Sequence, residues 1–295
     1  MGRRSTPCNG SRRSIPSLYP LCRRLPSPSS MIMVTSEFSH YRRSDGWLGR
    51  RFIYLERTTS TNEVLRRLAE EGAVEGMVIL ADEQTTGHGR LSRRWEAPPG
   101  TSLLFSLLFH PPEPFAYQAS RTTMLCGLAL CQAVALGAGL TTSLKWPNDL
   151  IIERAGDWRK LAGMLSEIGM AGGQPAFLIV GIGLNVNIPV EGLSQLSPNA
   201  TSLLAEIGHD VGRVALLDTF LQQTEVLVER LRAGWDPLAQ WRAALAWRGR
   251  TVRVQLPAEA LTGVAEDVDA EGSLVLRLPD GSRRCFPVGD VSLRL

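Results

Sequence analysis

Residues 84–95 contain the densest group of side chains that could bind a charged ligand. The segment holds three arginines, two glycines and a closing tryptophan: Arg90, Arg93, Arg94, Gly87, Gly89 and Trp95. Glycine allows backbone N–H groups to approach a ligand closely, and the guanidinium of arginine matches carboxylate and phosphate oxygens. A solvated basic loop has the same composition. This segment alone therefore leaves two interpretations open, an anion-binding loop and an ordinary surface loop.

Further segments decide in favour of an anion site. They follow in the order Lys145-Trp-Pro-Asn-Asp149, Lys160-Leu-Ala-Gly-Met-Leu-Ser-Glu167 and Gly181-Ile-Gly-Leu-Asn-Val-Asn187, with Ser60-Thr61-Asn62 upstream. In order and spacing these motifs closely resemble the catalytic domain of biotin protein ligases, over roughly residues 50 to 295. One such motif is weak evidence, whereas several in order are specific.

The resemblance implies an ATP-dependent ligase with two steps. The biotin carboxylate attacks the α-phosphate of ATP, giving biotinyl-5′-AMP and pyrophosphate, and a lysine of a biotin carboxyl carrier protein domain then takes the biotin. Because the first step brings an anionic nucleophile to a polyanion, it needs fixed positive charge. By the resemblance, Lys160 and Arg90 are the catalytic residues that supply it.

The resemblance also implies two sets of binding residues. Those for biotin are Ser60, Thr61, Asn62, Gln84, Gly87, His88, Gly89, Arg90, Lys160, Gly163, Gly181 and Gly183. Those for ATP are Arg90, Arg93, Trp95, Asn148, Asp149, Lys160 and Asn185, with Trp95 stacking on adenine. Asp149 is also the candidate Mg²⁺ ligand, since Mg²⁺ prefers carboxylate and carbonyl oxygens. Arg94 is expected to face solvent.

Each motif also has a plain structural interpretation. Ser60 to Glu63 has the form of a helix capping box, with Ser60 at the N-cap and Glu63 three residues on. Without its neighbours Lys160 would be a surface lysine and Trp95 a core anchor. The loop also departs from the family pattern, because His88 stands at the usual first arginine and Ser92 at the usual third glycine. The first change is expected to weaken retention of the adenylate or make it pH-sensitive. If His88 contributes only its backbone N–H, the change matters little.

Two other functions are weighed against this one. A lipoate–protein ligase shares the fold and the adenylate chemistry, but the Lys-Trp-Pro-Asn-Asp and Lys-Leu-Ala-Gly segments favour biotin. A biotin-responsive transcriptional repressor would need a DNA-binding domain, and no recognition helix is visible before Phe52. We expect a carrier-protein partner and leave a homodimer open. We expect no nucleic-acid partner and no membrane association.

Composition agrees with an ordinary globular enzyme, at 44% hydrophobic and 21% charged residues. Residues 1–36 contain six arginines and no acid, so the rest carries 26 basic and 29 acidic side chains and lacks the broad basic character of a nucleic-acid binder. The five cysteines form no C-x-x-C pair, which favours a reducing cytoplasm over a disulfide framework. The uncharged run from Met124 to Leu140 is expected to be a buried helix.

Periodicity and turn residues predict an α+β catalytic domain, a mixed β-sheet with helices on one side, followed by a small C-terminal SH3-like β-barrel. We expect the catalytic domain over residues 47–246 and the barrel over 247–295. Residues 1–46 are expected to be disordered, a transit peptide, or the product of a translation start assigned too early, with Met31 or Met33 the true one.

Overall fold

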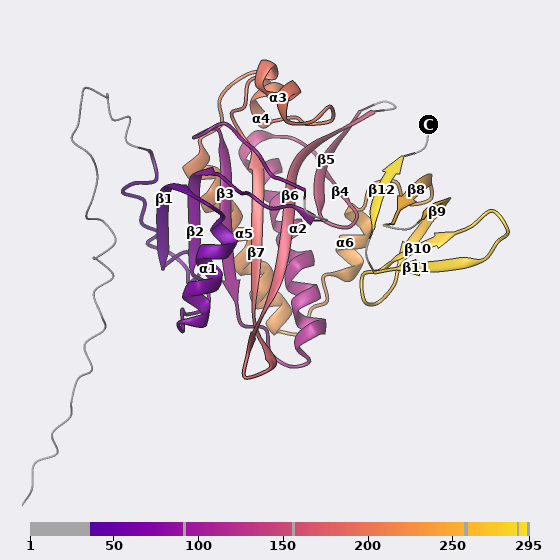
Figure 1. Cartoon of the computed structure of the whole chain (residues 1–295), viewed down its shortest axis with the longest axis horizontal. Helices are drawn as coiled ribbons and strands as arrows, with labels where there is room; N and C mark the ends of the chain where they lie inside the picture. The colour runs from indigo at the N-terminus through magenta and orange to yellow at the C-terminus, as the bar shows by residue number, and fades with distance from the viewer. Residues whose placement is uncertain (1–35, 91–92, 155–156, 257–258, 288, 294–295) are drawn as a thin grey trace, which may run out of the picture. The chain divides into compact units, whose positions relative to one another are not determined.

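The computed structural model describes residues 36–90, 93–154, 157–256, 259–287 and 289–293. The expectations for residues 1–35 and for Ser92 lie outside these ranges. Within them the chain forms a seven-stranded sheet, ordered β1-β2-β3-β7-β6-β5-β4, and a five-stranded sheet, ordered β11-β10-β9-β8-β12 (Figure 1). In the larger sheet β1 pairs with β2 in parallel, and every other neighbouring pair is antiparallel. The expected mixed sheet is confirmed.

The larger sheet is built from strands mixed with helices, and β4 to β7 follow one another without a helix between them. The strands are β1 Phe52–Thr58, β2 Val78–Gln84, β3 Ser102–Phe109, β4 Ser143–Lys145, β5 Asp149–Arg154, β6 Asp157–Ala171 and β7 Gln174–Asn185. The helices are α1 Thr61–Glu70, α2 Phe115–Ala138, α3 Val190–Leu196, α4 Leu203–Ile207, α5 Arg213–Arg232 and α6 Leu238–Ala244. The short helices α3 and α4 were not predicted, because neither is long enough to show a helical period.

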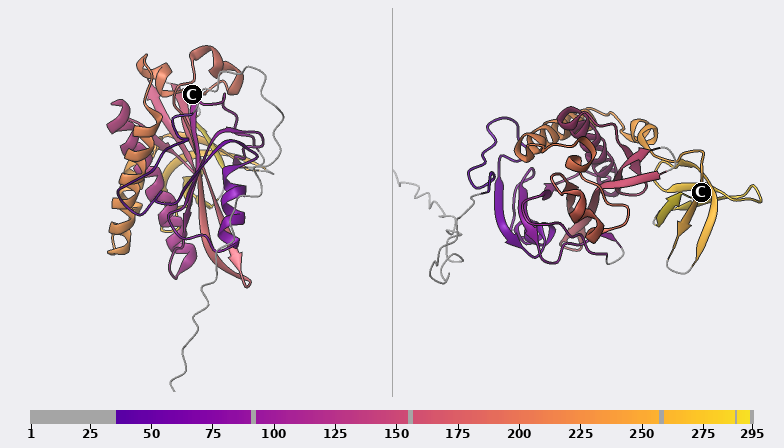
Figure 2. Two further views of the ribbon diagram at one scale, coloured as in Figure 1. Left: turned by 90° about the vertical axis from the view of Figure 1, so that its left-hand side faces the viewer. Right: turned by 90° about the horizontal axis from the view of Figure 1, so that it is seen from above.

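Helices cover both faces of the sheet, so the expectation of helices on one side is wrong. α2 and α5 pack together over one face, whereas α1 covers the other (Figure 2). The strands are apolar on both sides for this reason: on β3, Phe105 and Leu107 belong to the large core under α2 and α5, while Leu108 belongs to the small core under α1. The large core under α2 and α5 stabilises one face of the sheet, and the small core under α1 covers only part of the other face.

Helix α2 is the apolar run that the sequence places in the core. By length and composition it could cross a membrane, and 61% of its most apolar window is buried inside the fold. It packs on α5 and on the sheet. It begins at Phe115, ahead of the uncharged run that starts at Met124, and ends at Ala138, where the left-handed backbone of the C-cap suits Gly139.

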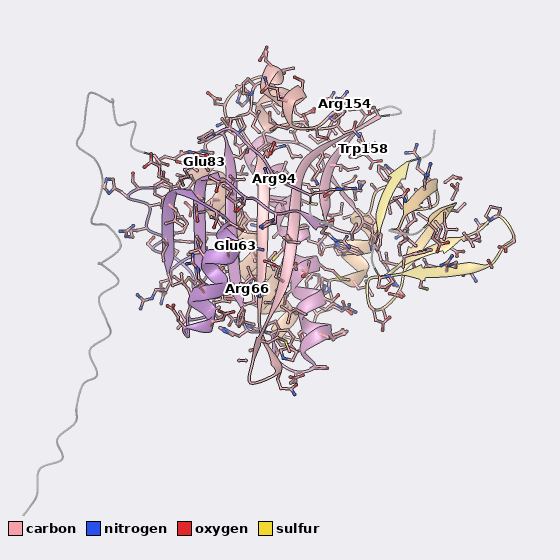
Figure 3. The ribbon with its side chains drawn as sticks, in the orientation of Figure 1. Glu63, Arg66, Glu83, Arg94, Arg154 and Trp158 are labelled. Carbon is pink, nitrogen blue, oxygen red and sulfur yellow. The ribbon has the colours of Figure 1, made fainter. Side chains whose placement is uncertain are left out.

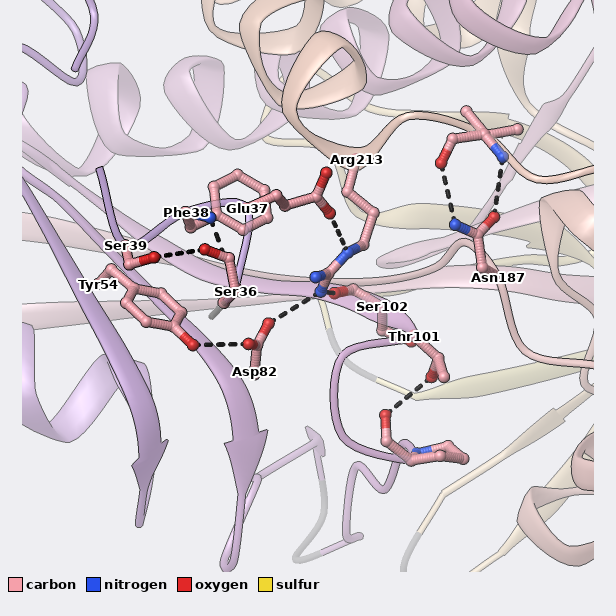
Figure 4. Close-up of polar contacts among 12 residues, drawn as sticks. Ser36, Glu37, Phe38, Ser39, Tyr54, Asp82, Thr101, Ser102, Asn187 and Arg213 are labelled. Carbon is pink, nitrogen blue, oxygen red and sulfur yellow. Dashed lines mark hydrogen bonds and ion pairs between the residues drawn. The ribbon is translucent and has the colours of Figure 1, made fainter. Parts of the chain in front are cut away.

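A buried ion-pair network joins the segment before β1 to the sheet and to α5 (Figure 4). Arg213 donates through Nη1 to Asp82 at 2.9 Å and to the carbonyl of Ser102 at 3.1 Å, and through Nε to Glu37 at 2.6 Å. The Tyr54 hydroxyl donates to the other oxygen of Asp82 at 2.6 Å. Burial, followed by this hydrogen bond, raises the pKa of Tyr54. Every oxygen of Asp82 thus has a donor, as a buried carboxylate requires.

The folded part begins earlier than the expected boundary at residue 46. Phe38 and Tyr41 are buried, and both rings pack against Phe52. Glu225 of α5 pairs with Arg43 at 2.8 Å and accepts the backbone N–H of Leu48 at 2.6 Å. Sequence analysis did not identify this segment, because it consists of turns without a hydrophobic period. Its structure is stabilised by residues that lie far along the chain.

The C-terminal strands form an antiparallel sheet rather than a closed barrel within the part of the chain that the structure describes. They are β8 Thr251–Gln255, β9 Ala260–Val268, β10 Leu274–Arg277, β11 Arg283–Phe286 and β12 Asp290–Leu293. The chain returns at β12 to pair with β8. This last strand was not predicted, and it is the one that brings the end of the chain back to the main domain.

Two cysteines of α2 should be inert toward thiol reagents. Burial raises the pKa of the Cys131 thiol to about 11, and burial raises that of Cys126 as well. At about pH 8 both stay protonated, and the thiolate is the reactive form. We expect iodoacetamide to label the exposed Cys285 and neither α2 thiol, as peptide mass mapping of native and urea-unfolded protein would measure. Labelling of Cys126 in the native protein would mean that α2 opens readily.

Candidate active site

A cleft of about 1030 Å³ lies on the α1 face of the main sheet. It collects nearly all of the residues singled out in the sequence: Ser60, Thr61, Asn62, Gln84, His88, Gly89, Arg90, Arg93, Trp95, Asn148, Asp149, Lys160, Gly163, Gly181, Gly183 and Asn185. Gly87 lies outside its lining. Segments separated by more than a hundred residues therefore meet in one cavity, as a single binding site requires.

The start of α1 forms one end of the cleft. Ser60, Thr61 and Asn62 are all buried, and Gln84 Oε1 accepts the backbone N–H of Thr61 at 2.8 Å. The predicted capping box is wrong. Ser60 does stand at the N-cap, but in the described structure its side chain makes no capping hydrogen bond.

Glu63 is directed to other partners. One of its oxygens accepts the Thr59 hydroxyl at 2.7 Å and the other pairs with His88 Nε2 at 3.3 Å. His88 thus turns its half-exposed ring toward α1. Figure 3 marks Glu63 and Arg66 along α1, and Arg94 on the loop beside them. Arg94 is exposed, as expected, and it also lines the cleft.

The loop after β2 closes on itself by backbone hydrogen bonds. Trp95 N–H donates to Gly87 at 2.9 Å, and Gly89 N–H donates to Arg93 at 2.7 Å. A Cβ at Gly87 would lie 2.5 Å from the carbonyl oxygen of Trp95. Glycine is needed here because the loop folds back so tightly, so Gly87 shapes the loop from outside the cleft.

Trp95 lies against the sheet over two facing glycines. Gly163 of β6 pairs with Gly183 of β7. A Cβ at Gly163 would lie 2.9 Å from the Trp95 ring, and one at Gly183 would overlap it. Because the two glycines lack side chains, the indole of Trp95 can pack directly on the backbone of the sheet. The Trp95 Nε1 atom is buried, with no hydrogen-bond partner among the described residues.

The carboxylate of Asp149 lies between two lysines. Lys160 Nζ is 2.7 Å from Oδ1 and Lys145 Nζ is 3.4 Å from Oδ2. Lys145 is buried, and its ammonium lies 5.4 Å from the ring centre of Trp158 and 5.9 Å from that of Trp247. Trp158 stands near the start of β6 (Figure 3), and Trp247 precedes the C-terminal sheet. Two ammonium groups on one carboxylate leave a net positive charge in the cleft.

A β-bulge directs Lys160 into the cleft. Leu150 pairs with Ala162 and Ile151 with Lys160, so Leu161 is one extra residue on β6. In a regular strand, residues three apart face opposite sides of the sheet. The bulge reverses that alternation, and Lys160 Nζ lies 3.3 Å from the position of a Cβ on Gly163. The lysine thus shares the face on which Trp95 lies.

The arrangement does not fit Asp149 as a magnesium ligand. Both of its oxygens already pair with ammonium groups, and nowhere in the described ranges do three or more His, Cys, Asp or Glu side chains gather. A Mg²⁺ ion that arrives with ATP would keep phosphate and water oxygens as ligands. Asn148 is held by its own hydrogen bond, from Nδ2 to the carbonyl of Met164 at 2.6 Å.

The segment after α3 completes one wall and was missed by sequence analysis. The backbone N–H of Lys160 donates to the carbonyl of Asn199 at 2.6 Å, and the backbone N–H of Thr201 donates to the carbonyl of Lys160 at 2.9 Å. Asn185 donates through Nδ2 to the carbonyl of Thr201 at 2.9 Å, and its Oδ1 is buried without a partner in the structure as described. Only the Pro198–Asn199 turn pointed to this segment, and turns are common.

The C-terminal sheet borders the cleft through the segment that leads into β12. Gly289 and Val291 line the cavity, and the carbonyl of Gly289 accepts Arg90 Nη1 at 3.5 Å. Positive charge, an aromatic face and uncharged polar groups thus surround one space. Such a site can hold an anion at the lysine end and a small polar ring near α1.

Known proteins share this architecture. Residues 54–185 match the Biotin/lipoate A/B protein ligase family, and residues 249–294 match the Biotin protein ligase C terminal domain. The solved structure of biotin protein ligase from Aquifex aeolicus, in complex with biotin and ATP, aligns with a TM-score of 0.68 at 27% identity and covers 83% of this chain and 99% of that one.

Two curated relatives are similar in sequence. The biotin–[acetyl-CoA-carboxylase] ligase of Mycobacterium tuberculosis is 34% identical over 255 residues, which are 83% of this chain and 89% of the relative. The bifunctional ligase/repressor BirA of Bacillus subtilis is 30% identical over 242 residues, 81% of this chain and 73% of the relative. With both matched regions and the motifs gathered in one cleft, this chain belongs to the biotin protein ligases of the biotin/lipoate A/B protein ligase family.

Proposed function

We propose that this protein is an ATP-dependent ligase that biotinylates a carrier protein. A biotin carboxylate oxygen attacks the α-phosphorus of ATP, the bond to the β-phosphate oxygen breaks, and pyrophosphate leaves. A lysine amine of the carrier then attacks the acyl carbon, AMP leaves, and the amine loses a proton. The observation that carries the proposal is the meeting of Lys160, Arg90 and the polar end of α1 around one cleft.

The charges in the cleft support a division of roles. Lys160 lines the cleft and carries a compact charge, and it bridges the carboxylate and the α-phosphate. Arg90 holds the adenylate phosphate, and Arg93 takes pyrophosphate oxygens. Asp149 keeps the two lysine ammonium groups apart and oriented. Asn148 and Asn185 contact the nucleotide.

The biotin end lies at α1. Thr61 and Gln84 hydrogen-bond the ureido ring, with Ser60 and Asn62 beside them. Gly163 and Gly183 leave room on the sheet for Trp95, and Gly181 leaves room for Asn62. The stacking of Trp95 on adenine stays a prediction.

The acceptor we propose is the biotin carboxyl carrier domain of a carboxylase, in the cytoplasm. Residues 36–46 join the catalytic part, 47–246, and the C-terminal part spans 247–295.

A homodimer remains a hypothesis. We propose no nucleic-acid or membrane partner.

Mass spectrometry of an apo carrier domain tests the reaction. The carrier is incubated with the protein, MgATP and biotin, and with lipoate in a parallel reaction. We expect a single gain of one biotinyl group, which a Lys-to-Arg substitution at the acceptor site of the carrier abolishes. A gain with lipoate alone would identify a lipoate–protein ligase, and no gain with either acid would contradict ligase activity.

Replacing Gly183 by alanine should weaken ligand binding in the cleft without unfolding the protein. The new methyl group would overlap the Trp95 indole, and a rigid sheet resists such overpacking. We expect the KM for biotin, beside Gly183, and the KM for ATP, the proposed partner of Trp95, each to rise about tenfold or more, measured by steady-state biotinylation. Gly212→Ala is the matched control, since its Cβ would lie 3.9 Å from the nearest side-chain atom. Equal kinetics for both variants would show that Trp95 moves freely.

Replacing His88 by arginine should slow release of the adenylate. Arginine adds a permanent charge and a guanidinium fork beside the loop. A charge-assisted hydrogen bond strengthens binding enough to slow release by about tenfold, as a chase of labelled biotinyl-AMP would measure. His209→Arg, an exposed site outside the cleft lining, is the control. An unchanged release rate would mean that only the backbone at residue 88 serves the ligand.

A further inference from the structure

A chain of hydrogen bonds, buried at Ser106 and partly exposed at Glu167, crosses the sheet behind the start of α1. Glu167 Oε2 of β6 accepts Asn62 Nδ2 at 2.6 Å. Asn62 Oδ1 lies 2.6 Å from the Ser106 hydroxyl of β3, which lies 2.7 Å from the Thr61 hydroxyl. Ser106 is fully buried, whereas Thr61, Asn62 and Glu167 line the cleft. The chain therefore joins the wall of the site to a group hidden behind it.

The donor and the acceptor of each hydrogen bond in the chain can be assigned by starting from the carboxylate of Glu167. An ionised carboxylate only accepts hydrogen bonds, so it holds the NH₂ group of the Asn62 amide. The carbonyl of Leu165, 3.4 Å from the same nitrogen, favours the same orientation. Asn62 Oδ1 must then face Ser106. That oxygen also lies where a Cβ on Gly181 would stand, so the amide fits only against a glycine.

The remaining protons have one consistent arrangement. Ser106 has a single hydroxyl hydrogen, and Asn62 Oδ1 can only accept, so Ser106 donates to it. The Thr61 hydroxyl has one hydrogen and two oxygens within reach, Ser106 Oγ at 2.7 Å and Gln84 Oε1 at 3.1 Å. Because the Ser106 hydrogen already goes to Asn62, the short contact between the two hydroxyl oxygens needs the Thr61 hydrogen, which is therefore donated to Ser106. At the far end Gln84 Oε1 already accepts the backbone N–H of Thr61. The Thr61 oxygen is therefore set as an acceptor at the cleft wall.

We propose that Glu167 and Ser106 are positioning residues that determine which hydrogen-bonding groups the cleft accepts. They act through Asn62 and Thr61 and make the wall complementary to a ligand edge that presents an N–H. This inference rests on the proposed function, in which a cyclic urea is the ligand head, and it adds the residues that set the polarity of its pocket. What orients Asn62 in this arrangement is the hydrogen-bond-accepting oxygen of Glu167, rather than the negative charge of its carboxylate.

Substitutions separate the acceptor from the charge. Glu167→Leu removes both, Glu167→Gln removes the charge and keeps an acceptor oxygen, and Arg66→Leu removes the ion pair that Glu167 makes at 3.1 Å. Ser106→Ala breaks the chain at its centre. Titration calorimetry with biotin should show Kd raised about tenfold in Glu167→Leu and Ser106→Ala. Glu167→Gln and Arg66→Leu should stay within about threefold of the wild type.

The affinity for ATP distinguishes positioning from general damage. We expect the Kd for ATP to change by less than about twofold in all four variants, since the lysine end is untouched. Equal loss in Glu167→Gln and Glu167→Leu would overturn the proposal, because charge would then be the cause. Biotin binding within about twofold of wild type in Glu167→Leu would also overturn it.

A readout without ligand keeps the inference separate from the proposed function. The side-chain amide signal of Asn62, assigned by its loss in Asn62→Asp, should exchange its hydrogens more slowly in the wild type than in Glu167→Leu. Equal exchange rates would overturn the chain of hydrogen bonds, whatever the ligand is. Slow exchange in a wild type that binds no biotin would support the chain and refute biotin as its ligand.

Discussion

Alanine at Lys160 should lower the rate of adenylate formation by about 10² to 10³-fold, the usual cost of removing one fixed donor from a site of developing charge. Lys160 is the lysine whose ammonium reaches both Asp149, at 2.7 Å, and the space beside Trp95. Lys145 cannot replace it, because its side chain is buried beside Trp158 and Trp247. Single-turnover formation of biotinyl-AMP measures the effect.

Two controls separate charge from position. Lys160→Arg keeps the charge on a bulkier group and should recover part of the rate. Arg159→Ala changes the neighbouring residue, whose 43% exposed side chain pairs with Asp157, and should leave the rate within about twofold. An unfolding temperature close to the wild type would exclude misfolding. Full activity in Lys160→Ala would remove Lys160 from the mechanism.

Methionine at Arg213 should lower the free energy of unfolding by about 3 kcal/mol, since it leaves the buried carboxylate of Asp82 without its guanidinium. Arg213 is 6% exposed and joins Glu37, Asp82 and the carbonyl of Ser102. Tyr54 still donates to Asp82, which limits the loss. Urea unfolding followed by circular dichroism measures the change, provided that the slope with denaturant is unchanged.

Arg57→Met is the matched control for that substitution. Arg57 pairs with Glu83 at 3.1 Å, but its side chain is 65% exposed. Solvent screens such a pair, so its loss should cost no more than about 1 kcal/mol. Similar losses in both variants would mean that the buried network contributes no more than a surface ion pair. Adenylate formation should survive in Arg213→Met below its unfolding transition, because Arg213 does not line the cleft.

Most of the elements could be predicted from local patterns. The apolar runs that became β3, β7 and α2 are recognised from neighbouring residues within the same run. Such patterns fail where order comes from distant partners. Residues 36–46 are held by Phe52 and Glu225, and Glu63 pairs with His88 in place of the expected cap. Neither partner is visible in a local window.

By itself the sequence determined the family, the order of the main elements and the group of residues that meet in the cleft. Short motifs suffice for this because they require particular residue types at particular spacings. Only the tertiary structure decided how those residues face one another. The bulge at Leu161 turns Lys160 toward Gly163, and β3 and β6 bring Ser106 and Glu167 to opposite sides of Asn62. Strand register and bulges depend on pairing between segments remote in the chain, and no local period records them.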